Sequence, residues 1–280
     1  MPDGRQWPKI SIVTTNLNYG LYLEETIRSV LLQNYPDLEY IVIDGGSTDG
    51  SLDIIRKYEP WVTWESEPDR GPSHAVNKGL RLASGEILGF LNSDDYYQPA
   101  TLAEIGRLID AAHKRYVVMG DTVQVNAQGE RVRLWKARTP SFYSLVFQYR
   151  LCRIGGIIVM PNQPSVFWHR KVRDSLGHFR EDLTYGFDYE YWLRMLINGF
   201  KFYNVHDAYS NYRFHDESLS FPGWGQFYPE WKNVSADYLK RLPVMKRLLT
   251  ELYWWFVLFP ISLVTLPHRG LSYLLGVKRG

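Results

Sequence analysis

Short apolar runs alternate with segments of helical spacing along the first hundred residues of this 280-residue chain. Strands separated by helices at this spacing form a mostly parallel sheet with right-handed crossovers, so we expect an α/β fold. A mostly parallel central sheet is then flanked by helices. The apolar runs predict strands near 10–14, 40–43, 61–64 and 87–91, with helices over about 21–33, 51–58 and 73–83 and another from Pro99.

Composition narrows the class of protein. With 45% hydrophobic residues the chain can bury a large core, and a net charge of +2 gives no reason to expect nucleic acid as a partner. Cys152 is the only cysteine, which excludes an intrachain disulfide and fits a reducing cytoplasm. Residues 1–8 are polar and have no apolar stretch of a signal peptide, so we expect a protein that is not exported.

Two adjacent carboxylates, Asp94 and Asp95, directly follow the buried run 87–91. Oxygen ligands suit Mn²⁺ or Mg²⁺, and these ions usually complete their shell with substrate phosphates. Asp44 directly follows the run 40–43, so it lies at the same edge of the sheet, where ligands bind in open α/β folds. The alternative is that Asp94 and Asp95 only begin a turn before the helix at Pro99.

Asp44 also begins a glycine-rich turn, residues 44–51. A carboxylate only accepts hydrogen bonds, so Asp44 could pair with the imide N–H of uracil or thymine or with the N1–H of guanine. A purely structural role in the turn is the alternative. No phosphate-binding glycine loop is present after the first strand, where Thr14, Asn16 and Asn18 stand, which disfavours kinases and dinucleotide dehydrogenases.

Five ordered segments within the first hundred residues carry a family resemblance. They are SIVTTNLN at 11–18, EETIRSV at 24–30, IDGGSTDGS at 43–51, SEPDRG at 66–71 and GEILGFLNSDD at 85–95. Further segments are QPSVF at 163–167, DYEYWLR at 188–194 and YRFH at 212–215. Together they resemble the family 2 glycosyltransferases of GT-A fold, over the chain to about Ser220.

The resemblance implies a GT-A catalytic domain over 1–220, with a nucleotide-sugar half at about 1–98 and an acceptor half at about 99–220. It implies that Asp44 binds the base, Asp94 lies near the ribose and sugar of the donor, Asp95 binds the metal and Asp188 is the catalytic base. The donor-binding set is completed by Thr14, Asn16, Asn18, Arg70 and Arg213. Two positions depart from the family pattern: Thr15 replaces the usual proline, and His74 replaces a typical acidic residue.

When a nucleoside diphosphate is displaced from a sugar, the negative charge on the leaving group must be neutralised. The metal at Asp95 and the side chains of Arg70 and Arg213 could supply the positive charge for this. Asp188 would project from a helix N-terminus as the base, although it could instead cap that helix. Glu190 is the rival base and faces roughly 200° away around the helix. One displacement by an activated hydroxyl inverts the anomeric centre.

His215 alternates with Arg213, and on a strand the two would share a face. The pair could bind the diphosphate, with His215 as a further metal ligand, or could belong to an ordinary surface strand. The other histidines show no metal-ligand spacing.

The last sixty residues, 221–280, are expected to form a helical extension. Basic residues at 240, 241, 246 and 247 precede an apolar stretch at 252–266, which is too short and too interrupted by Pro260 to span a bilayer. Such a segment could lie in the interface of an anionic membrane, or pack on the catalytic domain.

We therefore expect an inverting, metal-dependent glycosyltransferase. It would move a sugar from a UDP- or dTDP-linked donor to a hydroxyl of a saccharide or lipid-linked acceptor in cell-surface polysaccharide biosynthesis. It would work in the cytoplasm, with peripheral contact to the inner face of the membrane. The alternatives are a sugar-1-phosphate nucleotidyltransferase, which would need a glycine-rich basic first loop, and a non-catalytic saccharide-binding protein of the same fold.

Overall fold

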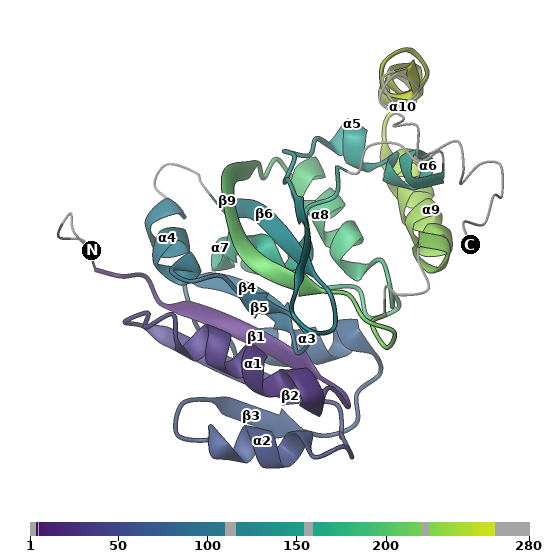
Figure 1. Cartoon of the computed structure of the whole chain (residues 1–280). Coiled ribbons are helices and arrows are strands. Elements are labelled where there is room, and N and C mark those ends of the chain that lie inside the picture. Colours follow the sequence, from purple (N-terminus) through teal and green to yellow (C-terminus); the bar gives the residue numbers. More distant parts are fainter. Residues whose placement is uncertain (1–3, 5, 110–115, 154–158, 220–223, 261–280) are drawn as a thin grey trace. The chain divides into compact units, whose positions relative to one another are not determined.

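Figure 1 shows the computed structural model of the chain, which describes residues 4, 6–109, 116–153, 159–219 and 224–260. The chain forms two compact units. The first comprises Met1–Thr139 and Pro161–Phe221, and the second comprises Pro140–Met160 and Pro222–Gly280. A stretch from the middle of the chain thus belongs to the same unit as the C-terminal segment, whereas the sequence had grouped it with the acceptor half.

Four parallel strands form the first part of the sheet, in the order β3-β2-β1-β4. Asn16 pairs with Asp44 and Thr15 pairs with Asn92, so β1, β2 and β4 end level with one another. The turns after these strands therefore meet at one edge, as the sequence predicted. The strands are β1 (Ile10–Asn16), β2 (Leu38–Asp44), β3 (Thr63–Ser66) and β4 (Ile87–Asn92).

The sheet continues through β8, β6, β9 and β5, and β7 pairs with β6. Strand β8 is antiparallel to both β4 and β6, so β6 again runs in the direction of β4. The complete sheet is mixed, and the predicted parallel arrangement holds for its first half. These strands are β5 (Tyr96–Tyr97), β6 (Val117–Val125), β7 (Arg131–Trp135), β8 (Val166–His169) and β9 (Phe202–Arg213).

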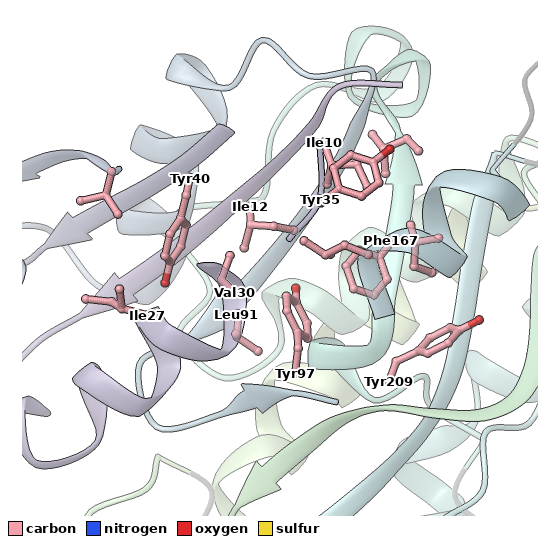
Figure 2. Close-up of a cluster of buried hydrophobic side chains, with 14 of the residues drawn as sticks. Ile10, Ile12, Ile27, Val30, Tyr35, Tyr40, Leu91, Tyr97, Phe167 and Tyr209 are labelled. Carbon is pink, nitrogen blue, oxygen red and sulfur yellow. The ribbon is translucent and has the colours of Figure 1, made fainter. Parts of the chain in front are cut away.

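Helices cover both faces of the parallel strands. Figure 2 shows one face, where Ile27 and Val30 of α1 meet Ile12 and Leu91 of the sheet. On the other face α3 lies close to β1, since a Cβ added at Gly79 would lie 2.3 Å from a methyl group of Val13. The helices of this unit are α1 (Gly20–Leu31), α2 (Ser51–Lys57), α3 (Pro72–Leu82), α4 (Thr101–Leu108), α7 (Arg170–Leu176) and α8 (Phe187–Ile197), with a short helix η1 (Gln163–Ser165).

The second unit is helical. Its helices are α5 (Phe142–Leu145), α6 (Gln148–Arg153), α9 (Trp224–Arg241), α10 (Val244–Tyr253) and η2 (Trp254–Leu258). A bidentate ion pair joins Arg150 to Glu251, with N···O distances of 2.8 and 3.0 Å. The rings of Phe147 and Trp254 pack together with their centres 5.4 Å apart. Within the described residues, no helix combines the length and apolar character that crossing a bilayer requires. Residues 261–266 of the predicted apolar segment lie outside the described part of the chain.

Candidate functional site

The Asp44 turn follows β2 at the shared edge of the sheet. The Oδ1 atom accepts hydrogen bonds from Asn16 Nδ2 at 2.7 Å and Ser47 Oγ at 2.6 Å. The Oδ2 atom accepts from Ser66 Oγ at 2.7 Å and from the backbone N–H groups of Gly46 and Ser47 at 3.0 and 2.9 Å. A carboxylate offers about four lone-pair positions, so these five donors occupy it fully.

This hydrogen bonding also sets the protonation state of Asp44. Burial opposes ionisation, but the bonds from Ser47, Ser66 and Asn16 outweigh it and lower the pKa of the Asp44 carboxyl. The side chain is an ionised, fully buried anchor for its turn. These contacts favour a structural role for Asp44, and the direct pairing with a base expected from the sequence stays a prediction.

The three polar residues after β1 differ in position. Thr14 is fully buried and its hydroxyl lies 3.0 Å from that of Tyr40, and the donor contact expected for it stays a prediction. Asn16 bonds Asp44 through its amide nitrogen, while its Oδ1 atom is buried without a hydrogen-bond partner among the described residues. Asn18 accepts from the backbone N–H of Thr48 at 2.8 Å and joins the same turn.

The Asp94–Asp95 turn follows β4 at the same edge. Helix α1 holds its backbone, because Thr26 Oγ1 donates to the carbonyl oxygens of Ser93 and Asp95, at 2.9 and 2.7 Å. Asp95 is fully buried, and burial together with the Asp94 charge raises the pKa of its carboxyl well above the usual range. Its Oδ1 accepts from the backbone N–H of Arg213 at 2.9 Å, whereas its Oδ2 has no partner in the described structure.

Arg213, at the end of β9, holds this turn from the other side. Its guanidinium donates to the carbonyl oxygens of Asp94 at 3.0 Å and Ala127 at 2.9 Å, and it pairs with the carboxylate of Glu25. The side chain is 2% exposed. Arg213 thus positions the two carboxylates, and the diphosphate contact expected for it stays a prediction.

His215 lies beyond the end of β9, so the strand alternation expected for it does not apply. It nevertheless reaches the same turn, with its Nε2 atom 3.2 Å from Asp94 Oδ2 and its ring packed against those of Tyr19 and Tyr22. The geometry makes His215 a partner of Asp94, and its role as a direct metal ligand stays a prediction.

The residues at this turn suit a cation that is bound together with a diphosphate. Among the described residues, no three His, Cys, Asp or Glu side chains are grouped so that they could hold a metal ion. Mg²⁺, however, is usually held by one or two carboxylates plus substrate phosphates. The unpartnered Oδ2 of Asp95 beside the Asp94 carboxylate provides such a pair.

Asp188 lies in the first turn of α8, and Gly186 is the N-cap of this helix. Its Oδ1 accepts the backbone N–H of Tyr189 at 2.6 Å. The ring of the preceding Phe187 packs 6.1 Å from that of Phe90, which brings the start of α8 to the end of β4. Glu190 is 3% exposed and its carboxylate is paired with Arg194 at 2.7 Å, so its geometry favours a structural role.

Arg70 follows β3 and leads into α3. Its guanidinium pairs with Glu181 at 2.5 Å, and most of its side chain is exposed. Glu181 also accepts a hydrogen bond from Asn77 at 3.0 Å. A ligand that binds the guanidinium of Arg70 would therefore have to replace or share its pair with Glu181.

Sequence reasoning missed residues that build the site without being charged. Thr26 holds the Asp94–Asp95 turn, and its signal was a hydroxyl among the apolar residues of α1. Gln163 donates to the carbonyl oxygen of Phe90 at 2.5 Å and accepts from Asn92 at 3.3 Å. It therefore fixes the last residues of β4, a role that only the folded chain makes visible.

The first comparisons with known proteins identify the family and similar sequences. A sequence model of "Glycosyl transferase family 2" matches residues 11–173. An uncharacterized glycosyltransferase of Nostoc sp. is 38% identical over 101 residues, which cover 35% of this chain and only 31% of that protein. TuaG of Bacillus subtilis, whose name assigns it to teichuronic acid biosynthesis, is 26% identical over 80% of this chain and 86% of its own.

Solved structures share the fold. TarS of S. aureus, in complex with UDP-GlcNAc, matches with a TM-score of 0.67 and 20% identity over 96% of this chain and 76% of its own. The mannosyltransferase PcManGT of Pyrobaculum calidifontis, in complex with GDP-Man and Mn²⁺, matches with a TM-score of 0.61 and 19% identity, covering 98% and 77%. The sheet described above is therefore that of a GT-A glycosyltransferase.

Proposed function

Because this chain belongs to glycosyl transferase family 2, we propose that it is an inverting glycosyltransferase that uses a nucleotide-diphosphate sugar and a divalent cation. The donor is UDP- or dTDP-linked, and the acceptor is a hydroxyl of a saccharide or lipid-linked saccharide. The observation that carries the proposal is the buried, unpartnered Oδ2 of Asp95 at the carboxyl end of β4, next to a second carboxylate.

In this proposal Asp95 and Asp94 hold Mn²⁺ or Mg²⁺ against the diphosphate, and the cation supplies charge neutralisation of the leaving group. Arg213 and Thr26 keep the two carboxylates in place through their contacts with the turn. Asp188 takes the proton of the acceptor hydroxyl as that hydroxyl attacks the sugar. One displacement of this kind inverts the configuration of the anomeric carbon.

The base of the donor is assigned to Asn16. Asp44 fixes the amide nitrogen of Asn16, which leaves its buried Oδ1 as a free acceptor at the sheet edge. An acceptor at this position pairs with the imide N–H of uracil or thymine. The bound UDP-GlcNAc of the TarS structure supports a uridine donor.

The names of the relatives support a role in the synthesis of cell-surface saccharides. The name of TuaG refers to teichuronic acid, and other relatives from Mycobacterium are named for PGL/p-HBAD biosynthesis. We assign the chain to cell-surface polysaccharide or glycolipid synthesis at the cytoplasmic face of the membrane.

Helix α10 supports the membrane contact. Thr250 of α10 and Trp254 of the following helix η2 are buried, whereas the other side of α10 and η2 exposes apolar residues spaced three and four apart. Lys246 and Arg247 are exposed beside this apolar side, as on helices that lie in an anionic membrane interface. The exposed apolar residues are Val244, Met245, Leu248, Leu249 and Leu252 of α10 and Trp255, Phe256 and Val257 of η2.

Nucleotide binding tests the donor. The thermal stability of the purified chain is measured with UDP, dTDP, GDP, ADP and CDP, each with and without Mn²⁺. UDP or dTDP with Mn²⁺ should raise the melting temperature most, because a ligand that binds only the folded state stabilises it. A larger shift with ADP or CDP, or no effect of Mn²⁺, would contradict the proposal.

Vesicle flotation tests the membrane contact. The double variant Leu248→Ser and Leu252→Ser should release the chain from anionic vesicles, while Val132→Ser, an exposed apolar position in the first unit, should not. Equal binding of both variants would remove the α10 face from the membrane contact.

A further inference from the structure

Strand β7 and the residues after it form an exposed basic stretch. The eight residues 131–138 contain four basic side chains and no acidic one. The preceding Glu130 already accepts a hydrogen bond from Asn126 at 2.8 Å. All four basic residues are exposed, namely Arg131, Arg133, Lys136 and Arg138.

Three of these basic residues have no ion partner. In the part of the chain that the structure describes, Arg131, Lys136 and Arg138 form neither an ion pair nor a hydrogen bond through their side chains. Other arginines of the same unit are paired, such as Arg56 with Asp53 and Arg180 with Asp182. A surface stretch of one charge sign raises the local concentration of ligands of the opposite sign, so this stretch favours an anionic ligand.

The fourth basic residue is held in place. Arg133 donates to Gln124 Oε1 at 2.6 Å and lies 4.3 Å from the ring centre of Trp135, whose indole N–H donates to the same oxygen. Arg131 lies two residues earlier, across an irregularity in the pairing of β7 with β6. The stretch therefore presents four exposed positive charges, of which Arg133 is fixed by its contacts with Gln124 and Trp135.

This basic stretch begins beside the candidate site. Strand β7 pairs with the C-terminal part of β6, which runs in the direction of β4 and so ends at the same edge of the sheet. The turn between β6 and β7 accepts a hydrogen bond from Arg213 at the Ala127 carbonyl, and Gly129 lies against Arg213 and Tyr96. Arg213 in turn holds Asp94 and Asp95. The outer edge of β7 pairs with no other strand among the described residues.

We propose that residues 131–138 bind the acceptor and that this acceptor is an acidic saccharide, carrying carboxylate groups along its chain. The inference rests on the proposed function and adds the chemical class of the second substrate. Four exposed cations within eight residues, with no acidic residue among them, match a polyanion. A lipid surface fits less well, because Val132 is the only large apolar side chain exposed in this stretch.

A matched pair of triple variants tests the proposal in the full-length chain. The first variant is Arg131→Gln with Lys136→Gln and Arg138→Gln. The control variant is Arg28→Gln with Lys171→Gln and Lys201→Gln, three exposed positions elsewhere in the same unit, so that the net charge changes equally. Calorimetry measures binding of an oligogalacturonate and of a neutral maltooligosaccharide of equal length, and the Mn²⁺-dependent thermal shift with UDP is recorded for each chain.

The parent chain should bind the oligogalacturonate and not the neutral saccharide. The first variant should bind it about tenfold more weakly, the control should bind like the parent, and added salt should reduce the difference. Equal weakening in both variants, or no preference for the acidic saccharide, would overturn the proposal. So would a first variant that loses binding to anionic vesicles while it keeps the saccharide. The UDP shift should be the same in all three chains. A parent that ignores UDP but prefers the acidic saccharide would support this surface and count against the donor assignment.

Discussion

Two carboxylates at the same edge of the sheet, Asp44 and Asp95, differ in their hydrogen bonding and in the direction of their pKa shifts. Asp44 receives five hydrogen bonds and its pKa is lowered, whereas Asp95 has one oxygen without a partner and its pKa is raised. Both side chains are fully buried. Burial alone therefore does not distinguish a structural carboxylate from a functional one, but the number of donors that the protein supplies does.

The largest expected effect follows from the unpartnered oxygen. Asp95→Asn should reduce turnover by about 10³-fold or more, because the substitution removes the charge that holds the cation. The melting temperature of the ligand-free chain should stay the same or rise, since a poorly satisfied buried charge is lost. Asp53→Asn, on the exposed surface of α2, serves as the control. An Asp95→Asn chain with normal turnover and lower stability would reverse the comparison.

Asp188 and Glu190 offer the same contrast on one helix. Asp188→Asn should lower kcat by about 10²-fold and leave donor affinity unchanged, because only proton acceptance is removed. Glu190→Gln should instead lower the melting temperature, because it breaks the buried pair with Arg194. Initial rates and thermal unfolding of both variants decide the assignment. An active Asp188→Asn beside an inactive, stable Glu190→Gln would make Glu190 the base.

Substitution of Asp44, whose carboxylate accepts five hydrogen bonds, should lower stability, in contrast to substitution of Asp95. Asp44→Asn replaces an acceptor by an amide whose nitrogen faces the N–H groups of Gly46 and Ser47. We expect the free energy of unfolding to fall by about 2 to 3 kcal/mol in urea titrations. Donor affinity should weaken as a consequence of the altered turn. Unchanged stability with lost nucleotide binding would restore direct base contact to Asp44.

Glu39, near the other end of β2, is a second carboxylate that accepts several hydrogen bonds, and the pH dependence of stability can test its contribution. Its carboxylate bonds Lys9 at 2.8 Å, Ser11 at 2.5 Å and Ser84 at 2.7 Å. Burial opposes ionisation, but these hydrogen bonds outweigh it and lower its pKa from 4.5 to about 2. At a partly exposed position we expect Glu39→Gln to cost about 1 to 2 kcal/mol at neutral pH.

The sign of the pH effect follows from the lowered pKa. The stabilisation by ionised Glu39 is complete above the pKa of the unfolded chain, 4.5, and is lost as pH falls through the folded value of about 2. The gap in unfolding free energy between parent and Glu39→Gln should therefore be constant from pH 7 to about pH 5 and close below it. A gap that persists at pH 2 would mean that the network depends on shape rather than charge.

The parallel half of the sheet could be predicted from the sequence because its signals are local. Buried apolar runs that end in Asp44 and Asp95 mark both the strands and the edge where their turns meet. The second half has no such signal, since β6, β8 and β9 pair across long sequence separations, and His215 lies past the strand on which it was expected.

The roles within the site were less predictable than its location. Whether Asp44 is saturated depends on Asn16 and Ser66, which lie in other turns. Arg213 could be recognised as important, but its direction could not be known, because its partners Glu25 and Ala127 are far away along the chain. Sequence patterns thus identify which residues lie together at the edge of the sheet. The contacts in the folded chain are needed to propose which of them bind a ligand and which position other side chains.

The contacts of Arg213 also bear on the order in which parts of the chain fold during synthesis. They join it to Asp95 across 118 positions and to Glu25 across 188. During synthesis the strands β1 to β4 can pair while Arg213 has not yet been made, because all four are complete by Asn92. A nascent chain therefore acquires its nucleotide-side framework early and its finished cation turn late. An unfinished chain would hold both carboxylates without the arginine that positions them.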